Sequence, residues 1–474
     1  MKNMSLIQIA KACSGQLSGE DSVGKEISGV VIDSRQVEKD NLFIATAGER
    51  VDGYNYIDSA FDRGALAVVC ERIPVDPKGP YIIVENSLTA LKDIARWYRM
   101  QLSAKIIGIT GSVGKTSTKE FISSVLSQRY SVLRTEGNFN NEVGLPLTIL
   151  KIREEHEVAV LEMGISHFGE MHRLSEIAKP DIAVITNIGQ CHLENLGSRQ
   201  GVLKAKTEIF DFMGEAAKVI INGDDDMLTT IKEVKGHPPY RFGMEKCSFQ
   251  ADAEHNANGV YASDIITKGL FGSVCDIHIK DKVFRADIPL PGTHMIRNAL
   301  AGAFVGALLS LTLEEIAAGI ASVKPLGGRS NIIRTDRFTI IDDCYNANPV
   351  SMKTAIDLLC MADTGRAAIL GDMGELGEGE KDLHRKIGAY AASSNLDSLI
   401  FVGSLSEYMA EGASETLRIR QEEACPSSYP KIYYYKTRDE LIDALPHILH
   451  DFDTVLVKAS HSMGFDSIVK ALFY

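Results

Sequence analysis

The segment from Lys105 to Ser123, KIIGITGSVGKTSTKEFIS, contains residue types that bind phosphate, at a spacing suited to it. Its apolar, β-branched start predicts a buried strand, GSVGKT predicts a tight loop, and the following residues predict a helix. Backbone N–H groups of such a loop point at phosphate oxygens, and the helix N-terminus adds partial positive charge. Lys115 would reach the β- and γ-phosphates of a nucleotide, and the Thr116 hydroxyl would ligate Mg²⁺. The predicted cradle comprises Gly111, Ser112, Val113, Gly114, Lys115, Thr116 and Ser117.

This loop departs from the usual phosphate-loop pattern, which has a glycine five residues before the Gly-Lys pair. Ile109 stands at that place, and the loop glycine is Gly111. The alternative interpretation is a glycine turn before a core helix, with the lysine on the surface. The strand and the helix that the motif requires are both predicted, and this favours phosphate binding.

Two neighbouring segments carry oxygen ligands. EVAVLEMG is typical of a buried strand and ends near Glu162. A carboxylate at the C-terminal edge of a strand, beside a phosphate loop, is well placed to ligate Mg²⁺, and an acid in a surface turn is the alternative. Asn138, Asn140 and Asn141 form helices and strands poorly, which predicts a loop that presents amides to a polar ligand. A capping turn is the alternative there.

A histidine and two lysines follow the next predicted strand, DIAVITNIG. His192 lies in the loop after that strand, and an ordinary polar surface group is the alternative to a site residue. GVLKAKTEIF predicts a helix that brings Lys204 and Lys206 close to this loop. Residue chemistry does not choose between the two lysines, because either could be solvated.

Composition excludes several classes of protein. A hydrophobic content of 45% and a charged content of 24% are ordinary for a globular chain, and a net charge of −13 argues against a general nucleic-acid binder. The N-terminus lacks the apolar core of a signal peptide. The apolar stretch Asn298–Leu313 is too short to span a bilayer, so we expect a buried helix and no membrane insertion. The 8 cysteines are scattered, which predicts free thiols in the cytoplasm.

The chain of 474 residues predicts three α/β domains, at 1–102, 103–323 and 324–474. The first is small, and the second alternates strands and helices around the phosphate loop. The third alternates strands with helical segments, which predicts a mainly parallel sheet covered by helices on both faces. Functional loops of such a sheet lie at the C-terminal ends of its strands, where Asp343 and Ser460 fall.

Taken together and in order, several segments resemble the Mur ligases, the ATP-dependent amide ligases of peptidoglycan precursor synthesis. The matching segments are GSVGKTSTKE, TEGNFNNEVGLPLT, LEMG, HLENLGS, KAKTEIF, PGTHMIRNALAG, IIDDCYNANPVSM, GDMGELG and VKAS. The resemblance implies an N-terminal UDP-substrate domain, a central ATPase domain with a parallel sheet, and a C-terminal Rossmann-like domain.

Two of these segments, YNANPVSM and GDMGELG, are most similar to one member of the family. That member joins D-alanyl-D-alanine to UDP-N-acetylmuramoyl-tripeptide, the last cytoplasmic amino-acid addition to the precursor. The member that adds the third residue and a folylpolyglutamate-type synthetase remain alternatives, and a regulatory P-loop ATPase is a rival from another class. The resemblance implies ATP and two Mg²⁺ ions as cofactors, and we expect a monomer.

The resemblance also gives roles to individual residues. Lys115 and Thr116 match groups that hold the ATP phosphates and Mg²⁺, and Glu162 matches a ligand of that ion. His192 matches a ligand of a second Mg²⁺. Lys206, chosen by its KxxxF spacing, matches a carbamylated lysine whose added carboxylate helps to hold the second ion.

Residues outside the central motif receive expected roles in the same way. Asn298 matches an asparagine at the adenine, and Arg329 and Asp343 match C-terminal groups that close on the γ-phosphate and the nucleotide. The remaining matches are Ser34 and Arg35, at the uridine diphosphate, and Asn346 and Asn348, on the D-alanyl-D-alanine side.

Three residues depart from the family pattern. Met295 stands where an asparagine usually follows the histidine at 294, and Ala459 and His461 replace the glycine and arginine of VKGSR. The first departure affects a polar contact near the nucleotide. The other two affect a C-terminal contact with substrate.

The resemblance implies a two-step reaction. The terminal carboxylate of the tripeptide would attack the γ-phosphorus of ATP, giving an acyl phosphate and ADP. The amine of D-alanyl-D-alanine would then attack the acyl carbon and release phosphate. Phosphoryl transfer depends on positioning and charge neutralisation, so Lys115, Arg329 and the metal ions would suffice without a nucleophilic side chain.

Overall fold

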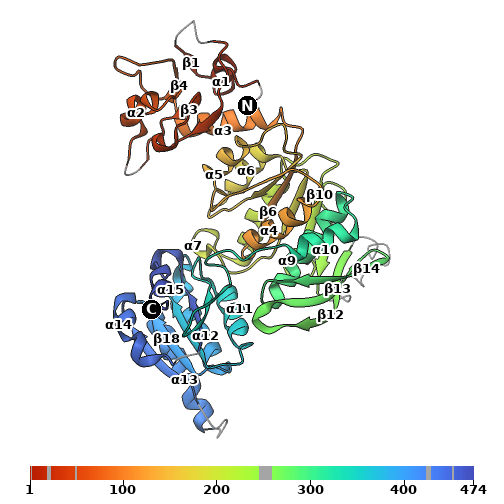
Figure 1. Ribbon diagram of the computed structural model, residues 1–474, viewed down its shortest axis with the longest axis vertical. Helices are drawn as coiled ribbons and strands as arrows, with labels where there is room; N and C mark the ends of the chain where they lie inside the picture. Colours follow the sequence, from red (N-terminus) through yellow and green to blue (C-terminus); the bar gives the residue numbers. More distant parts are fainter. Residues whose placement is uncertain are drawn as a thin grey trace.

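The computed structural model contains three separate β-sheets that follow one another along the chain (Figure 1). It describes residues 1, 3–18, 23–48, 51–244, 259–422, 429–450 and 453–473. The N-terminal sheet lies at one end of the long axis, and the C-terminal sheet lies at the other (Figure 1). This arrangement confirms the predicted α/β class with three sheets, and the exact domain boundaries stay predictions.

The N-terminal sheet has five strands in the order β1-β5-β4-β3-β2, and only β1 is antiparallel to its neighbour. Its strands are β1 Gln16–Leu17, β2 Gly29–Val31, β3 Asn41–Ile44, β4 Ala67–Cys70 and β5 Tyr81–Ile83. Its helices are α1 Leu6–Ala12, η2 Ser34–Gln36, η3 Gly53–Tyr56, α2 Ile57–Asp62 and α3 Ser87–Arg99. Helix α3 has an apolar face that is buried between this sheet and the central one, so it ties the two together.

The central sheet has nine strands in the order β14-β13-β12-β11-β10-β9-β6-β8-β7, parallel from β7 to β12. Its strands are β6 Lys105–Thr110, β7 Val132–Arg134, β8 Val158–Glu162, β9 Ile182–Ile185, β10 Lys218–Asn222, β11 Tyr240–Gly243, β12 Gly259–Thr267, β13 Ser273–Ile279 and β14 Lys282–Ile288. Strand β6 pairs with β8 and β9, so the loops after these three strands meet at one edge. Ligands of open parallel sheets bind at such an edge.

Helices cover both faces of the central sheet. They are α4 Lys115–Leu126, α5 Gly144–Ile149, α6 Glu170–Ala178, α7 Leu193–Leu196, α8 Arg199–Thr207, η4 Glu208–Phe210, η5 Leu228–Thr230, η8 Gly269–Phe271, α9 Thr293–Leu308 and α10 Leu313–Ala321. Helix α9 contains most of the apolar stretch from 298 to 313 and is buried against α4, as predicted. A Cβ at Gly302 would lie 3.2 Å from the backbone of Phe121, so glycine lets these helices approach closely. Among the described residues, no helix is long and apolar enough to cross a bilayer.

The C-terminal sheet has six strands in the order β15-β16-β20-β17-β18-β19, and only β15 is antiparallel. Its strands are β15 Asn331–Arg334, β16 Thr339–Asp342, β17 Arg366–Gly371, β18 Ser398–Val402, β19 Lys431–Tyr435 and β20 Thr454–Lys458. Its helices are α11 Pro349–Leu359, η9 Gly377–Gly379, α12 Glu380–Ser393, α13 Ser406–Glu422, α14 Arg438–Ile448, η10 His461–Met463 and α15 Asp466–Ala471. Successive strand residues enter two different apolar clusters, so helices cover both faces, as predicted.

Helices α12 and α13 pack closely, and this contact gives a test of the C-terminal fold. A Cβ at Gly388 would lie 1.8 Å from the carbonyl oxygen of Met409, so the helices must move apart to admit one methyl group. We expect Gly388→Ala to lower the free energy of unfolding by about 1–3 kcal/mol. Gly214→Ala is the matched control, because nothing lies within 4 Å of a Cβ there. Denaturant unfolding of both variants measures the effect, and equal midpoints would contradict this close packing.

Candidate active site

The loop between β6 and α4 has the backbone geometry of a phosphate cradle. Gly114 is left-handed with φ of 83° immediately before α4, and Gly111 has φ of 149°. A Cβ at Gly111 would lie 1.9 Å from Thr186 Oγ1, so only glycine fits there. The first intrahelical bond of α4 runs from Thr118 N–H to Gly114 C=O. The N–H groups of residues 115–117 therefore have no acceptor inside the helix, and these residues line the cleft.

The two residues that follow strand β9 fix the shape of this loop. Asn187 Oδ1 accepts from Val113 N–H at 2.9 Å, and Thr186 Oγ1 donates to Val113 C=O at 2.6 Å. The Lys115 side chain folds back over the loop, and its Nζ donates to Gly111 C=O at 2.8 Å. These hydrogen bonds fix the shape of the loop and hold the lysine against it.

Glu162 lies at the end of β8 with each carboxylate oxygen bonded. Thr116 Oγ1 donates to one oxygen at 2.8 Å, and Asn140 Nδ2 donates to the other at 2.8 Å. Glu162 is 2% exposed and Thr116 is 4% exposed. A buried carboxylate beside a hydroxyl gives oxygen ligands of the kind that Mg²⁺ prefers, so these residues fit that ion.

The two lysines of α8 have opposite environments. Lys204 is exposed, with Nζ 5.9 Å from the Phe168 ring centroid, whereas Lys206 is fully buried. The pKa of Lys206 is lowered to about 8, chiefly by burial; the nearby Cys191 opposes this effect, and the charge of Lys115 adds a smaller lowering. The structure thus distinguishes the two lysines that residue chemistry left equivalent.

His192 lies where the central and C-terminal sheets meet. It immediately precedes α7 in a left-handed conformation, and its Nδ1 contacts the carboxylate of Glu375 in the C-terminal part. The hydrogen bond from His192 holds the pKa of Glu375 below its usual range. A Cβ at Gly377 would lie 3.2 Å from Glu194 Cα, so the GELG segment fits closely against α7. Glu375 was not predicted, because sequence order does not show which loops meet across two sheets.

The C-terminal part contributes to the cleft an ion pair whose lysine is buried. Lys458 Nζ is 2.6 Å from Asp343 Oδ2 and also donates to Asn346 C=O at 2.9 Å. The other oxygen of Asp343 accepts from Ser330 N–H at 2.8 Å. Lys458 was not predicted as a site residue. It lies in the matching segment VKAS, but only the parallel pairing of β16 with β20 brings this lysine to Asp343.

Arg329 stacks over the Tyr345 ring, with its guanidinium carbon 3.9 Å from the centroid. His461 approaches the same ring at 5.5 Å between centroids. His461, one of the three departures from the family pattern, therefore takes part in an aromatic contact with a residue that lines the cleft. Ala459, another departure, is fully buried next to Gly371.

A cleft of about 560 Å³ brings most of the predicted residues together. Those that line it are Ser112, Val113, Gly114, Lys115, Thr116, Ser117, Asn140, Asn141, Glu162, His192, Arg329, Asp343, Asn346 and Asn348. Gly111 and Lys206 are buried and do not line this cleft, and Asn138 is exposed outside it. Ser34 and Arg35 lie in the N-terminal part, where Arg35 pairs with Asp33 and is 83% exposed.

A second cleft of about 580 Å³ adjoins the first and contains Asn298. Thr118 Oγ1 donates to Asn298 Oδ1 at 3.0 Å, and Asn298 Nδ2 lies 3.5 Å from the Met295 sulfur. Sulfur is a weak acceptor, so this amide keeps its capacity to donate to a ligand. The departure at Met295 therefore leaves Asn298 oriented by Thr118.

His294 lines both clefts and was also missed, although it precedes Met295 in a segment that matched the family. Its Nδ1 is buried and has no hydrogen-bond partner among the described residues. Burial lowers the pKa of His294 to about 4, so the ring is neutral at pH 7. A neutral imidazole can both donate and accept a hydrogen bond, so His294 can bind a polar ligand where the two clefts adjoin.

Comparisons with known proteins agree with this geometry, which is that of a nucleotide-binding α/β enzyme. Models of the Mur ligase family match as the catalytic domain at 26–99, the middle domain at 109–306 and the glutamate ligase domain at 328–461. The UDP-N-acetylmuramoyl-tripeptide--D-alanyl-D-alanine ligase of Bacillus subtilis is 37% identical over 98% of this chain and 97% of its own. This chain belongs to the Mur ligase family, which confirms the resemblance seen in the sequence.

Solved structures give the same result. MurF from Acinetobacter baumannii has a TM-score of 0.87 and 29% identity, covering 99% of this chain and 98% of that one. MurF ligase from Thermotoga maritima, in complex with ADP, has a TM-score of 0.78 and 29% identity, covering 94% and 96%. The three-sheet fold is therefore that of solved family members.

The lowered pKa of His294 predicts a pH dependence of stability. The unfolded histidine binds a proton as the pH falls through its ordinary value of about 6.5, whereas the folded one stays neutral down to about 4. Acid therefore favours the unfolded state, by at most about 2 kcal/mol between pH 7 and pH 5. We expect the wild type to lose more unfolding free energy over that range than His294→Asn. Parallel curves from unfolding titrations would contradict the assignment.

Proposed function

We propose that this protein is an ATP-dependent ligase that joins D-alanyl-D-alanine to UDP-N-acetylmuramoyl-tripeptide. The observation that carries this proposal is a single cleft that unites two motifs from different sheets. The phosphate loop reaches it from the central sheet, and Asn346 and Asn348 of YNANP reach it from the C-terminal sheet. The named activity of the Bacillus subtilis relative supports the same substrates.

Roles within the cleft follow from its donors. Lys115, Thr116 and the free N–H groups of α4 would bind the phosphates of ATP, and Asn298 would bind the base. Thr116 and Glu162 would hold one Mg²⁺, and His192 with a carbamate on Lys206 would hold a second. Bound Mg²⁺ neutralises phosphate charge and so favours attack by an anion. Arg329 and Asp343 would close on the nucleotide from the C-terminal side.

The chemistry needs a carboxylate made electrophilic and an amine brought to it. The tripeptide carboxylate attacks the γ-phosphorus, the bond from that phosphorus to ADP breaks, and an acyl phosphate forms. The amine of D-alanyl-D-alanine attacks the acyl carbon, loses a proton and displaces phosphate. Lys115 and Arg329 contribute positive charge at the transferred group, and both line the cleft. No side-chain nucleophile is required.

The distal parts of the substrates would lie at the two ends of the site. Ser34 and Arg35 would contact the uridine diphosphate, and Asn138, Asn140 and Asn141 would contact substrate near the phosphate loop. Asn346 and Asn348 would lie on the D-alanyl-D-alanine side. Asn348 also begins α11 as its N-cap, accepting from Ser351 N–H at 2.9 Å, so its backbone position is fixed. We also propose a cytoplasmic monomer.

The alternatives differ in the acceptor rather than in the first step. A ligase that adds the third residue would release phosphate with the dipeptide precursor and an amino acid, and a folylpolyglutamate-type synthetase would need folate. A regulatory ATPase would release phosphate without any of these. The YNANP segment in the cleft favours D-alanyl-D-alanine.

Phosphate release tests the proposal directly. We expect ATP-dependent release that requires both UDP-N-acetylmuramoyl-tripeptide and D-alanyl-D-alanine, with a product at the pentapeptide mass. Lys115→Ala should lower kcat/KM by about 10²-fold or more, because one preorganised charge at the transferred group is lost. Release that ignores D-alanyl-D-alanine would favour the other ligases, and release that ignores both substrates would contradict the proposal.

Carbamylation of Lys206 has its own test. Only a neutral amine attacks CO₂, forming an N–C bond and losing a proton, and a pKa of about 8 leaves a substantial neutral fraction near pH 7.5. We expect a carbamate carbon signal by NMR in ¹³C-bicarbonate that disappears in Lys206→Ala and persists in Lys204→Ala. A signal unaffected by Lys206→Ala, or no signal in the wild type, would contradict it.

A further inference from the structure

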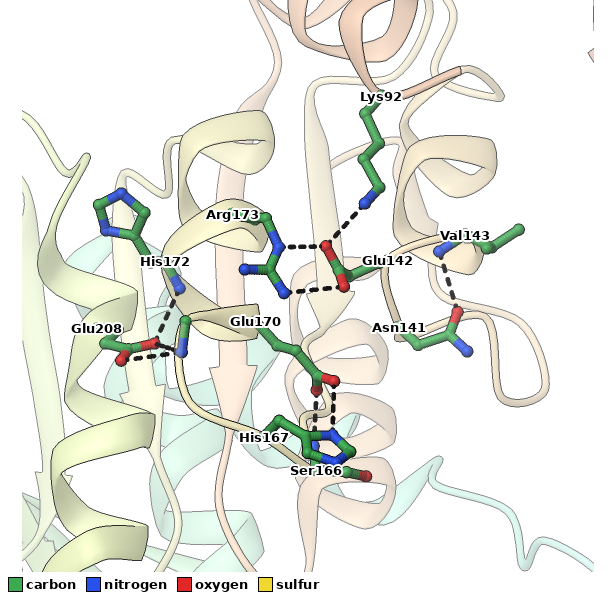
Figure 2. Close-up of polar contacts among 11 residues, drawn as sticks. Lys92, Asn141, Glu142, Val143, Ser166, His167, Glu170, His172, Arg173 and Glu208 are labelled. Carbon is green, nitrogen blue, oxygen red and sulfur yellow. Dashed lines mark hydrogen bonds and ion pairs between the residues drawn. The ribbon is translucent and has the colours of Figure 1, made fainter. Parts of the chain in front are cut away.

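The carboxylate of Glu142 is bonded by cations from two separate parts of the molecule (Figure 2). Lys92 on α3 donates to Oε1 at 2.8 Å. Arg173 on α6 approaches both oxygens, with Nε 2.5 Å from Oε1 and Nη2 3.0 Å from Oε2. The hydrogen bond from Arg173 holds the pKa of Glu142 below its usual range, so the carboxylate stays charged.

Glu142 belongs to the loop that orients Glu162. Two residues before it, Asn140 donates through Nδ2 to Glu162 and accepts at its carbonyl from Gly164 N–H at 2.8 Å. The adjacent Asn141 accepts from Val143 N–H at 3.2 Å (Figure 2). It also accepts from Gly144 N–H at 2.9 Å, which fixes the turn before α5. A shift of Glu142 must therefore move the amide that holds one oxygen of Glu162.

Helix α6 is a fixed support for this contact. Glu208 accepts from Gly169 N–H at 3.1 Å and from His172 N–H at 3.2 Å, and thus satisfies free donors at the start of α6 (Figure 2). Glu170 accepts from Ser166 N–H at 2.7 Å, which closes the loop before the helix. Arg173 therefore projects from a helix whose N-terminus is held by two carboxylates.

We infer that Glu142 is a positioning residue that fixes the Asn140 loop, and through it Glu162, to helices α3 and α6. The inference rests on the proposed function, which gives Glu162 the role of a Mg²⁺ ligand. Because Lys92 belongs to the helix that leaves the N-terminal sheet, the contact also connects that sheet to the phosphate site.

Stability alone does not account for this arrangement. The side chains of Lys92, Glu142 and Arg173 are 28%, 26% and 46% exposed. Ion pairs this exposed contribute little to folding, typically below about 1 kcal/mol. Groups that orient a metal ligand, in contrast, change metal affinity by about 10–100-fold when they act directly on it. Glu142 acts through Asn140, so we expect a smaller effect.

The test is the Mg²⁺ dependence of ADP binding, measured by calorimetry on the full chain. We expect Glu142→Gln to raise the half-saturating Mg²⁺ concentration about three- to tenfold, while its unfolding temperature stays near that of the wild type. Glu315→Gln is the matched control. Glu315 also pairs through both oxygens with an arginine, Arg129, and Gln retains its capping interaction with Thr312, far from the cleft.

A second variant separates the positioning role from a folding defect. Lys92→Met removes the contact with α3 and leaves the Glu142 pair with Arg173 intact. We expect it to raise the half-saturating Mg²⁺ concentration by a smaller factor, with no added effect in the Glu142→Gln background, because both act through one loop. Wild-type Mg²⁺ dependence in Lys92→Met, or in a folded Glu142→Gln, would overturn the inference.

Glu162→Gln distinguishes the failure of this inference from the failure of the proposed function. If Glu162→Gln weakens Mg²⁺-dependent ADP binding and Glu142→Gln does not, the metal ligand stands and the positioning role fails. If neither variant changes it, Glu162 is not the ligand, and the inference falls with that assignment. The assay contains neither the tripeptide nor D-alanyl-D-alanine, so the choice of substrates does not affect it.

Discussion

The buried charge of Glu162 is the constraint on which the site depends. A carboxylate at 2% exposure needs a donor on each oxygen, because an unpaired charge in this environment is strongly destabilising. Thr116 of the phosphate loop satisfies one oxygen, and Asn140 of the neighbouring loop satisfies the other. The same pair of bonds therefore fixes two loops relative to strand β8 and leaves oxygen ligands in place for a cation.

The active cleft is completed only where the C-terminal sheet meets the central one. The contact of His192 with Glu375 and the close fit of Gly377 on α7 join the central and C-terminal parts of the chain. From the C-terminal side, Lys458 pairs with Asp343 and donates to Asn346 C=O, so one buried cation holds two residues that line the cleft.

Local chemistry made much of this predictable from the sequence. The glycine loop, the carboxylate at the end of β8 and the alternation of strands and helices all follow from short-range patterns, and the structure brings them together at one sheet edge. Lys458, Glu375 and Glu142 depend on which strands pair and which loops face each other across sheets. The choice of Lys206 over Lys204 depends on burial, which helix spacing alone did not resolve.

The departures from the family pattern are explained by their neighbours. His461 stands where the family has an arginine, yet Tyr345 retains a cation through Arg329 on its ring, at 3.9 Å. A Cβ at Gly371 would lie 2.7 Å from the Ala459 Cβ, so the methyl group of Ala459 fits only because its neighbour is glycine. Asn298 is held by Thr118 at its oxygen, and its amide nitrogen contacts only the weakly accepting sulfur of Met295 among the described residues, so it can still donate to a ligand. None of the three residues takes part in the hydrogen bonds that hold Glu162 and the phosphate loop, so the replacements leave that part of the site unchanged.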